Sequence, residues 1–168
     1  MKKVSVLIAV VCSLFVVSCG EKKEEKKDGF EMTRAKEEVS NDAEEDVNVI
    51  ALASTDLMSY DKAELRVEAG KKVTLTLRHT GKMDKNVMGH NFVLLKKDTD
   101  LATFATAAMT ARDTEYIPES DAIIAYTKLI GGGESVTITF DAPEVGTYDF
   151  ICSFPGHYAV MKGKFIVE

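Results

Sequence analysis

The sequence predicts an all-β fold, a sandwich or barrel of short strands with one short inserted helix, in residues 47–168. Three observations predict it. Apolar residues alternate with polar ones in many short segments, turn-forming residues separate these segments, and only one segment has helical spacing. Short strands without interleaved long helices are typical of sandwiches and barrels.

The strands are predicted in chain order from this alternation. In the first strand, Val47, Val49 and Ala51 are the apolar positions of a half-buried segment. The other segments with strand character are 65–67, 73–79, 92–95, 123–126, 136–140, 148–152 and 165–167. Turn signals fall between them at 68–70, in the triple glycine 131–133 and at 143–146.

The inserted helix is predicted in residues 98–112. An Asp or Thr at its start can cap the first turn. Apolar residues then follow at helical spacing: Leu101, Phe104, Ala105, Ala108 and Met109. We expect this helix to pack on the outside of the sandwich.

Residues 1–18 are typical of a bacterial export signal. Two lysines precede an apolar run from Val4 to Val17, which is too short and wrongly flanked for a spanning helix. The run ends in Val-Val-Ser-Cys, which resembles the lipobox of bacterial lipoproteins, so we expect Cys19 to carry a lipid. An ordinary signal peptide with an incidental Cys19 is the alternative.

Residues 19–46 are expected to be the lipidated Cys19 and a charged, flexible tether. Residues 20–46 contain six Lys or Arg and eleven Asp or Glu, with few large apolar side chains. Such a segment cannot bury enough apolar surface to offset its ordering entropy. The tether would let a lipid-anchored domain move away from the membrane surface.

The charge and cysteine content of the domain narrow its function. Residues 47–168 contain 13 basic and 16 acidic residues without a basic patch, which argues against nucleic acid as a partner. Cys152 is the one cysteine left after Cys12 is removed with the signal and Cys19 is lipidated. Exported proteins usually pair their cysteines or lack them. A metal is therefore a good reason for this free thiol.

The segment 152–161 places a thiolate, an imidazole and a thioether in the order Cys-x4-His-x3-Met. A blue copper centre uses two His and one Cys in a trigonal arrangement, with a long, weak bond to an axial Met. The second histidine has to be His79 or His90. A structural zinc site is the alternative metal site, although zinc would favour another Cys or His over Met161.

Three segments resemble the azurins, a family of bacterial cupredoxins. They read Asn-Val-Met-Gly-His-Asn at 86–91, Tyr-Thr-Lys-Leu-Ile-Gly at 126–131 and Cys-Ser-Phe-Pro-Gly-His-Tyr-Ala-Val-Met at 152–161. The resemblance covers residues 47–168 and implies a Greek-key, cupredoxin-like β-sandwich. It implies one type 1 copper, and the implied ligands are His90, Cys152, His157 and Met161, with a weak axial carbonyl from Gly89.

The resemblance also implies how the neighbours of the copper ligands act. The backbone N–H groups of Asn91 and Phe154 would donate hydrogen bonds to the thiolate, and the Asn91 side chain would tie the two ligand loops together. His79 matches an azurin histidine that lies near the copper without binding it. We expect His79 to be a core histidine with a hydrogen-bond partner.

A docking surface for redox partners is the last site implied by the resemblance. Its residues would surround the copper end of the domain as an exposed, adaptable apolar patch. They are Met58, Met83, Val87, Met88, Met109 and Ala159, with Phe154 beside them. Burial of the methionines as ordinary core residues is the alternative.

The sequence therefore predicts a monomeric electron carrier that is not an enzyme. It would be exported to the periplasm or cell envelope and held at a membrane by its lipid. The expected partners are a c-type cytochrome, a copper nitrite reductase, a terminal oxidase or a cytochrome c peroxidase. A copper carrier or chaperone for an exported cuproenzyme is the alternative, and it would favour exposed ligands with extra Met or His donors. A catalytic copper domain would need an open coordination position or a second copper.

Overall fold

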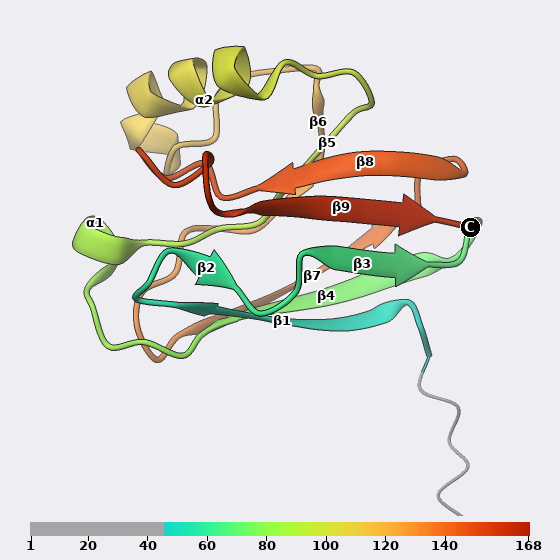
Figure 1. Cartoon of the computed structure of the whole chain (residues 1–168), viewed down its shortest axis with the longest axis horizontal. Helices are drawn as coiled ribbons and strands as arrows, with labels where there is room; N and C mark the ends of the chain where they lie inside the picture. Colours follow the sequence, from blue (N-terminus) through green and yellow to red (C-terminus); the bar gives the residue numbers. More distant parts are fainter. Residues whose placement is uncertain (1–45) are drawn as a thin grey trace, which may run out of the picture. The chain divides into compact units, whose positions relative to one another are not determined.

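The computed structural model describes residues 46–168, so the predicted signal (1–18) and nearly all of the predicted tether (19–46) lie outside the described residues. Two sheets make up the described part (Figure 1), with strand orders β2-β1-β4-β7 and β3-β9-β8-β5-β6. The strands are β1 (Val49–Thr55), β2 (Ser59–Tyr60), β3 (Glu64–Val67), β4 (Lys72–His79), β5 (Val93–Leu95), β6 (Ile123–Tyr126), β7 (Ser135–Asp141), β8 (Gly146–Ile151) and β9 (Lys162–Val167). The predicted fold class, a β-sandwich with a short inserted helix, is confirmed.

The hydrophobic core lies between the two sheets. Its largest fully buried side chains include Phe92, Phe150 and Phe165, which meet Leu75 and Leu77 of β4. Full burial of a side chain of this size stabilises the fold by about 1.5–3 kcal/mol. The core therefore holds the ends of several strands in fixed positions, and these ends carry the candidate site.

The inward face of β1 differs from the prediction. Val49 is 63% exposed, whereas Ile50 and Leu52 are 7% and 1% exposed. The reason is the parallel pairing of β1 with β4, which sets Ile50 beside Leu75 and Leu52 beside Leu77. Residues side by side in neighbouring strands point to the same face of a sheet, so the buried leucines of β4 fix which face of β1 is buried.

The inserted helix α2 (Leu101–Thr110) is capped at its N-terminus by Asp100, whose side chain accepts a 2.7 Å hydrogen bond from the Thr103 N–H. Its buried residues are Phe104, Ala105 and Ala108. Phe104 belongs to a second apolar cluster with side chains of β5 and β8, namely Val93, Leu95 and Ile151. The helix lies outside the five-stranded sheet (Figure 1), as predicted.

Three short elements were not predicted. Strand β2 has two residues, and the 3-10 helix η1 (Arg112–Thr114) has three. Helix α1 (Lys85–Met88) has four, with Asp84 accepting a hydrogen bond from the Asn86 N–H. Such short segments carry too few residues for a periodic pattern. Among residues 46–168, no helix combines the length and the apolar character that a membrane-crossing helix needs.

The strand pairings gather the candidate site at one end of the sandwich. β5 pairs with β8, with Val93 opposite Ile151, and β8 pairs with β9, with Ile151 opposite Lys162. The residues just before Val93 and just after Ile151 therefore lie side by side. The segment 152–161 is the connection between β8 and β9, at the same end as α1 (Figure 1).

Candidate metal centre

The loop 152–161 folds into consecutive turns that aim three side chains inward. The backbone N–H of Cys152 donates to the Met161 carbonyl across the mouth of the loop at 2.9 Å, and the Met161 N–H donates to the His157 carbonyl at 2.8 Å. Gly156 adopts a φ of +84°, which a residue without Cβ adopts readily. Cys152, His157 and Met161 are all buried as a result.

His90 reaches the same point from the segment before β5. Its backbone exchanges two hydrogen bonds with Ile130, and its ring Nε2 lies 2.9 Å from the Thr55 carbonyl. A carbonyl can only accept, so Nε2 carries the proton and Nδ1 keeps a free lone pair. This Nδ1 faces the Cys152 sulfur, as the free nitrogen of a metal-binding histidine must.

Three donor atoms converge in the buried end of the sandwich. The Cys152 sulfur lies 3.9 Å from His90 Nδ1 and 3.6 Å from His157 Nδ1, and the three ligand atoms all lie within 4.8 Å of one another. Met161 packs in one apolar cluster with Cys152, Leu129 and Phe154. Two imidazole nitrogens, one sulfur and a nearby thioether are the donor set of a type 1 copper site, so the residues fit copper.

Gly89 brings backbone close to the same centre. Its carbonyl oxygen lies 3.9 Å from the Cys152 sulfur. A Cβ at this position would lie 2.3 Å from the Lys85 carbonyl oxygen and 2.8 Å from the Leu129 side chain. Only glycine therefore allows this close approach of the backbone without a shift of its neighbours.

Asn91 links the two segments that carry the ligands. Its side-chain Oδ1 accepts from the Ser153 N–H at 2.9 Å, and its Nδ2 donates to the Ser153 hydroxyl at 2.8 Å. The Ser153 hydroxyl in turn donates to the Tyr116 carbonyl at 2.7 Å, which ties in the segment after α2. Sequence reasoning missed Ser153 and Tyr116, because neither residue type signals a bond between distant segments.

Burial governs the protonation of the donor groups. It lowers the pKa of His90 and of His157 to about 4, so both rings are neutral and ready to bind a metal at neutral pH. Burial also raises the pKa of the Cys152 thiol to about 12, although the backbone N–H groups of Asn91 and Phe154 offset part of this effect. A bound cation is what deprotonates such a thiol.

His79 is buried next to the centre but outside the set of converging donors. Its ring lies edge-on to the His90 ring, with 4.4 Å between the ring centroids. Nε2 lies 3.2 Å from Asp56 Oδ1, at ion-pair distance. Neither ring nitrogen makes a hydrogen bond of good geometry among residues 46–168. The Asp56 carboxylate is therefore the polar neighbour of His79, in place of the expected hydrogen-bond partner.

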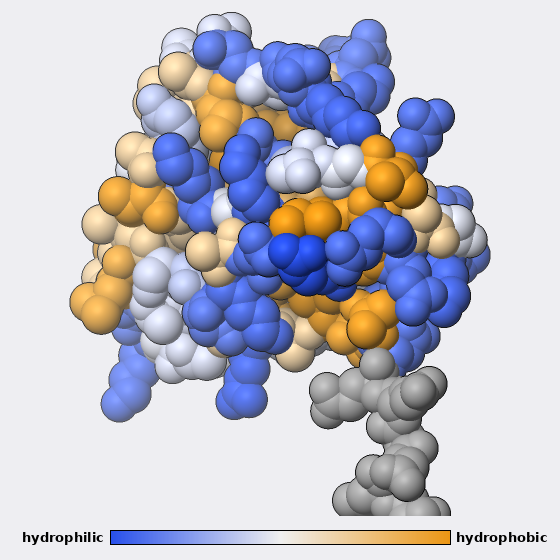
Figure 2. Space-filling model, turned by 45° about the vertical axis from the view of Figure 1, so that its right-hand side comes forward, coloured by the Kyte–Doolittle hydropathy of each residue, from blue (hydrophilic) through white to orange (hydrophobic). Residues whose placement is uncertain are grey.

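Most of the residues expected to form a docking surface are exposed. Met58, Met83, Val87 and Met109 are at least 37% exposed, Ala159 is exposed and Met88 is partly buried. Sequence reasoning missed Leu57 and Val160, which are 83% and 65% exposed. Leu57 lies two residues after Thr55, whose carbonyl is bonded to His90, and Val160 directly precedes Met161. Other apolar side chains are exposed elsewhere, and Figure 2 shows hydrophobic patches separated by hydrophilic residues. A residue is therefore assigned to the candidate docking surface only if it is exposed and also lies near the metal-binding side chains.

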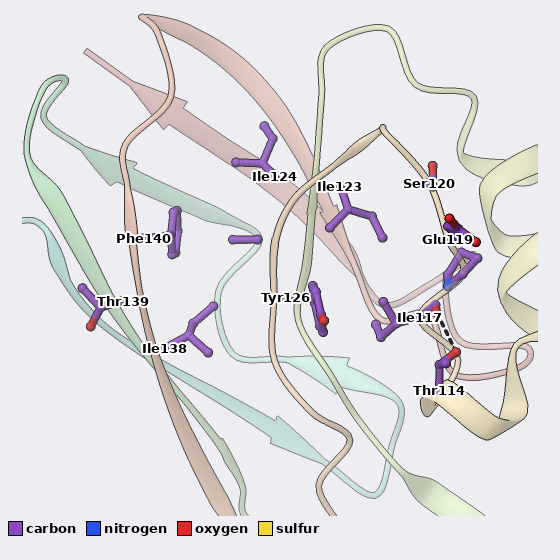
Figure 3. A pocket seen from close by; sticks show the side chains of 12 residues that line it. Thr114, Ile117, Glu119, Ser120, Ile123, Ile124, Tyr126, Ile138, Thr139 and Phe140 are labelled. Carbon is purple, nitrogen blue, oxygen red and sulfur yellow. Dashed lines mark hydrogen bonds between the residues drawn. The ribbon is translucent and has the colours of Figure 1, made fainter.

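A cavity of about 660 Å³ lies away from this centre, between the edge strands β6 and β7. Figure 3 shows apolar side chains around it, among them Ile123, Ile124, Ile138 and Phe140. None of the converging donors lines this cavity. The candidate metal centre is instead a closely packed cluster of buried donors, with the ligand atoms within 4.8 Å of one another.

Comparison with known proteins agrees with this donor set. Residues 47–168 match the family described as copper-binding proteins of the plastocyanin/azurin family. Azurin-1 of Alcaligenes xylosoxydans xylosoxydans is 44% identical over 120 residues, 68% of this chain and 92% of that protein. Azurin of Pseudomonas fluorescens biotype C is 45% identical over 120 residues, 68% of this chain and 93% of that protein. The structure of reduced auracyanin from Roseiflexus castenholzii is similar with a TM-score of 0.66 and 38% identity, over 72% of this chain and 97% of that one.

The metal-free protein is predicted to lose stability as the pH falls from about 6.5 to about 4. In this window the unfolded histidines bind protons and the buried His90 and His157 do not, because their folded pKa values lie at about 4. Protonation therefore favours unfolding, by up to about 2 kcal/mol for each histidine at pH 5. Urea unfolding of the metal-free protein at about pH 7 and about pH 5 measures the loss.

The variant His157→Gln isolates the contribution of one histidine, because carboxylates that titrate in the same range are shared by both proteins. Its loss of stability between the two pH values should be smaller than that of the wild type. An equal loss in both proteins would contradict the assignment of the pH dependence to the buried imidazoles.

Proposed function

The chain belongs to the plastocyanin/azurin family of copper-binding proteins, and on this premise we propose that it carries single electrons between redox partners through a type 1 copper. The observation that carries the proposal is the buried convergence of His90 Nδ1, Cys152 Sγ and His157 Nδ1 within 4.8 Å of one another. Copper bound there supplies a Cu(I)/Cu(II) couple. The protein supplies donors whose positions are already fixed.

Fixed donors suit electron transfer better than catalysis. The donor side chains are buried and packed, and hydrogen bonds to Thr55, Ile130 and Ser153 hold the segments that carry them. Donors that keep the same positions in the Cu(I) and Cu(II) states let an electron be transferred with little structural rearrangement. Among residues 46–168, one such group of metal-binding side chains is found, without a second cluster for a catalytic copper. The burial and packing of the donors thus support our proposal that the protein is an electron carrier and not an enzyme.

The proposed docking surface consists of Leu57, Met58, Met83, Val87, Met88, Met109, Ala159 and Val160. Most of these residues are exposed. Four of them lie within three residues of a donor along the chain, namely Val87, Met88, Ala159 and Val160. Leu57 and Met58 closely follow Thr55, whose carbonyl is bonded to His90. A small apolar surface of flexible side chains favours weak, short-lived complexes, which an electron carrier needs. The partners we propose are a c-type cytochrome, a copper nitrite reductase, a terminal oxidase or a cytochrome c peroxidase.

We further propose that the domain works at a membrane surface in the periplasm or cell envelope. The sequence supports this with the pattern of an export signal in 1–18, the lipobox-like segment that ends at Cys19 and the charged segment 20–46. A tethered carrier searches a small volume, which raises its effective concentration near membrane-bound partners.

The alternative of a copper carrier has less support. A carrier that hands its ion to another protein would favour accessible ligands and additional Met or His donors. Here Cys152 and Met161 are fully buried and His157 is 3% exposed. Exchange of the ion would have to open the loop, so the structure favours retention of copper over delivery.

Loading the protein with Cu(II) should give an intense blue absorption band from charge transfer between the Cys152 thiolate and the copper. The variant Cys152→Ser should lose this band, because serine offers no thiolate. The control Cys19→Ser removes a cysteine outside the domain and should keep it. A pale protein, or a band that survives in Cys152→Ser, would contradict the proposed function.

The docking surface is tested by electron self-exchange, in which two copies of the protein act as partners. Val87→Lys places a charge on the surface of both copies, so like charges meet in the encounter complex. The self-exchange rate, measured by NMR line broadening in mixtures of Cu(I) and Cu(II) protein, should fall at least about tenfold, or about 1.4 kcal/mol. The matched control is Val49→Lys, at an equally exposed valine on β1. Equal slowing by both variants would overturn the assignment of the surface.

A further inference from the structure

Tyr60 of β2 makes a polar contact beside the metal centre that the sequence analysis did not foresee. Its hydroxyl donates a hydrogen bond to the Asn91 backbone carbonyl. Its ring packs against Phe150, with 5.5 Å between centroids, and against the cluster that contains Cys152 and Met161. The phenol is thus held by apolar contacts on its ring and by one directed bond at its oxygen.

Tyr60 holds Asn91, the residue that links the His90 segment to the loop of Cys152. The Asn91 side chain is bonded through both of its polar atoms to Ser153, the residue next to Cys152. This places the Asn91 backbone beside the Cys152 sulfur, and its N–H lowers the pKa of the thiol against the effect of burial. The carbonyl is the remaining polar group of Asn91, and Tyr60 is its partner. Each polar group of Asn91 therefore has a partner, and these partners together fix where its N–H points.

The same hairpin also holds a histidine of the centre. β1 pairs with β2 with Thr55 opposite Ser59, and the two hydroxyls lie 2.8 Å apart. The Thr55 carbonyl accepts the bond from His90 Nε2. The hairpin of β1 and β2 thus contacts two consecutive residues, His90 and Asn91. Thr55 contacts His90, and Tyr60 contacts Asn91.

We propose that Tyr60 is a positioning residue that sets the reduction potential of the copper centre by holding the Asn91 N–H against the Cys152 sulfur. The inference rests on the proposed function, because the potential is a property of the copper-loaded site. A hydrogen bond to a thiolate withdraws electron density from the sulfur and stabilises the reduced state, in which the sulfur carries more negative charge. Loosening this bond therefore lowers the potential.

The hydroxyl is suited to a permanent donor role. Burial, and after it the nearby Cys152, raise the pKa of Tyr60 well above its ordinary value of 10. The phenol therefore keeps its proton at any physiological pH, and at a carbonyl oxygen it can only donate. Phenylalanine would fill nearly the same volume and would lack the bond, so it separates the bond from the packing.

The experiment compares the copper-loaded wild type with Tyr60→Phe and with Tyr148→Phe. Tyr148 also donates its hydroxyl proton to a backbone carbonyl, that of Glu144 at 2.6 Å, but at the start of β8 rather than at its metal end. The two variants lose the same kind of bond. Voltammetry measures the potential, and NMR of the Cu(I) protein measures the chemical shift of the Asn91 amide proton.

Tyr60→Phe should lower the potential by the equivalent of at least a threefold change in the Cu(I)/Cu(II) ratio, about 28 mV since a tenfold change is 59 mV. Its Asn91 amide proton should move upfield, as expected for a weaker hydrogen bond. Tyr148→Phe should leave both readouts at the wild-type values. The wild-type Cu(I) protein should also show a slowly exchanging Tyr60 hydroxyl proton, a readout that does not depend on whether either variant folds.

Three results would overturn the inference. They are an unchanged potential in Tyr60→Phe, equal shifts in both variants, or a rapidly exchanging Tyr60 hydroxyl in the wild type. If the wild type keeps its blue band while one of these results is found, the proposed role of Tyr60 is wrong and the proposed function stands. A wild type without the band would overturn the proposed function itself, and the role of Tyr60 with it.

Discussion

Burial of the Cys152 sulfur is the constraint on which the metal centre depends. The side chain is fully buried, and its thiol pKa rises to about 12, even with N–H groups of Asn91 and Phe154 directed at the sulfur. A thiolate in this position needs a cation to balance its charge. The buried, neutral imidazoles of His90 and His157 can share that cation but cannot supply the charge. The thiolate form of Cys152 and the bound metal ion therefore require each other.

The frame around the sulfur is built from backbone groups of three separate segments. Thr55 orients the His90 ring, Ile130 holds the His90 backbone, and Ser153 joins the loop 152–161 to Asn91. None of these contacts requires a metal ion, so the frame exists before the ion binds. A preformed frame limits the rearrangement of the donors between oxidation states. It also lowers the stability of the metal-free protein at acidic pH, because protonation of His90 and His157 favours unfolding.

Sequence reasoning succeeded where the signal is local and failed where it depends on pairing. The donors of segment 152–161 lie on one short loop, and α2 has its own cap and apolar face, so spacing alone predicts both. The inward face of β1 could not be predicted, because Val49 and Ile50 are both apolar and only the pairing with β4 decides between them. Tyr60 and the Thr55 carbonyl contact residues more than thirty positions away. A backbone carbonyl also leaves no mark in the sequence.

The proposed function requires that the protein hold its donors in one arrangement for both oxidation states of copper. X-ray absorption spectroscopy at the copper edge tests this on the same sample, first oxidised and then reduced. We expect one short Cu–S and two Cu–N distances in both states, with the same set of ligands. Loss of a histidine on reduction, or a change in the number of strong ligands, would contradict it.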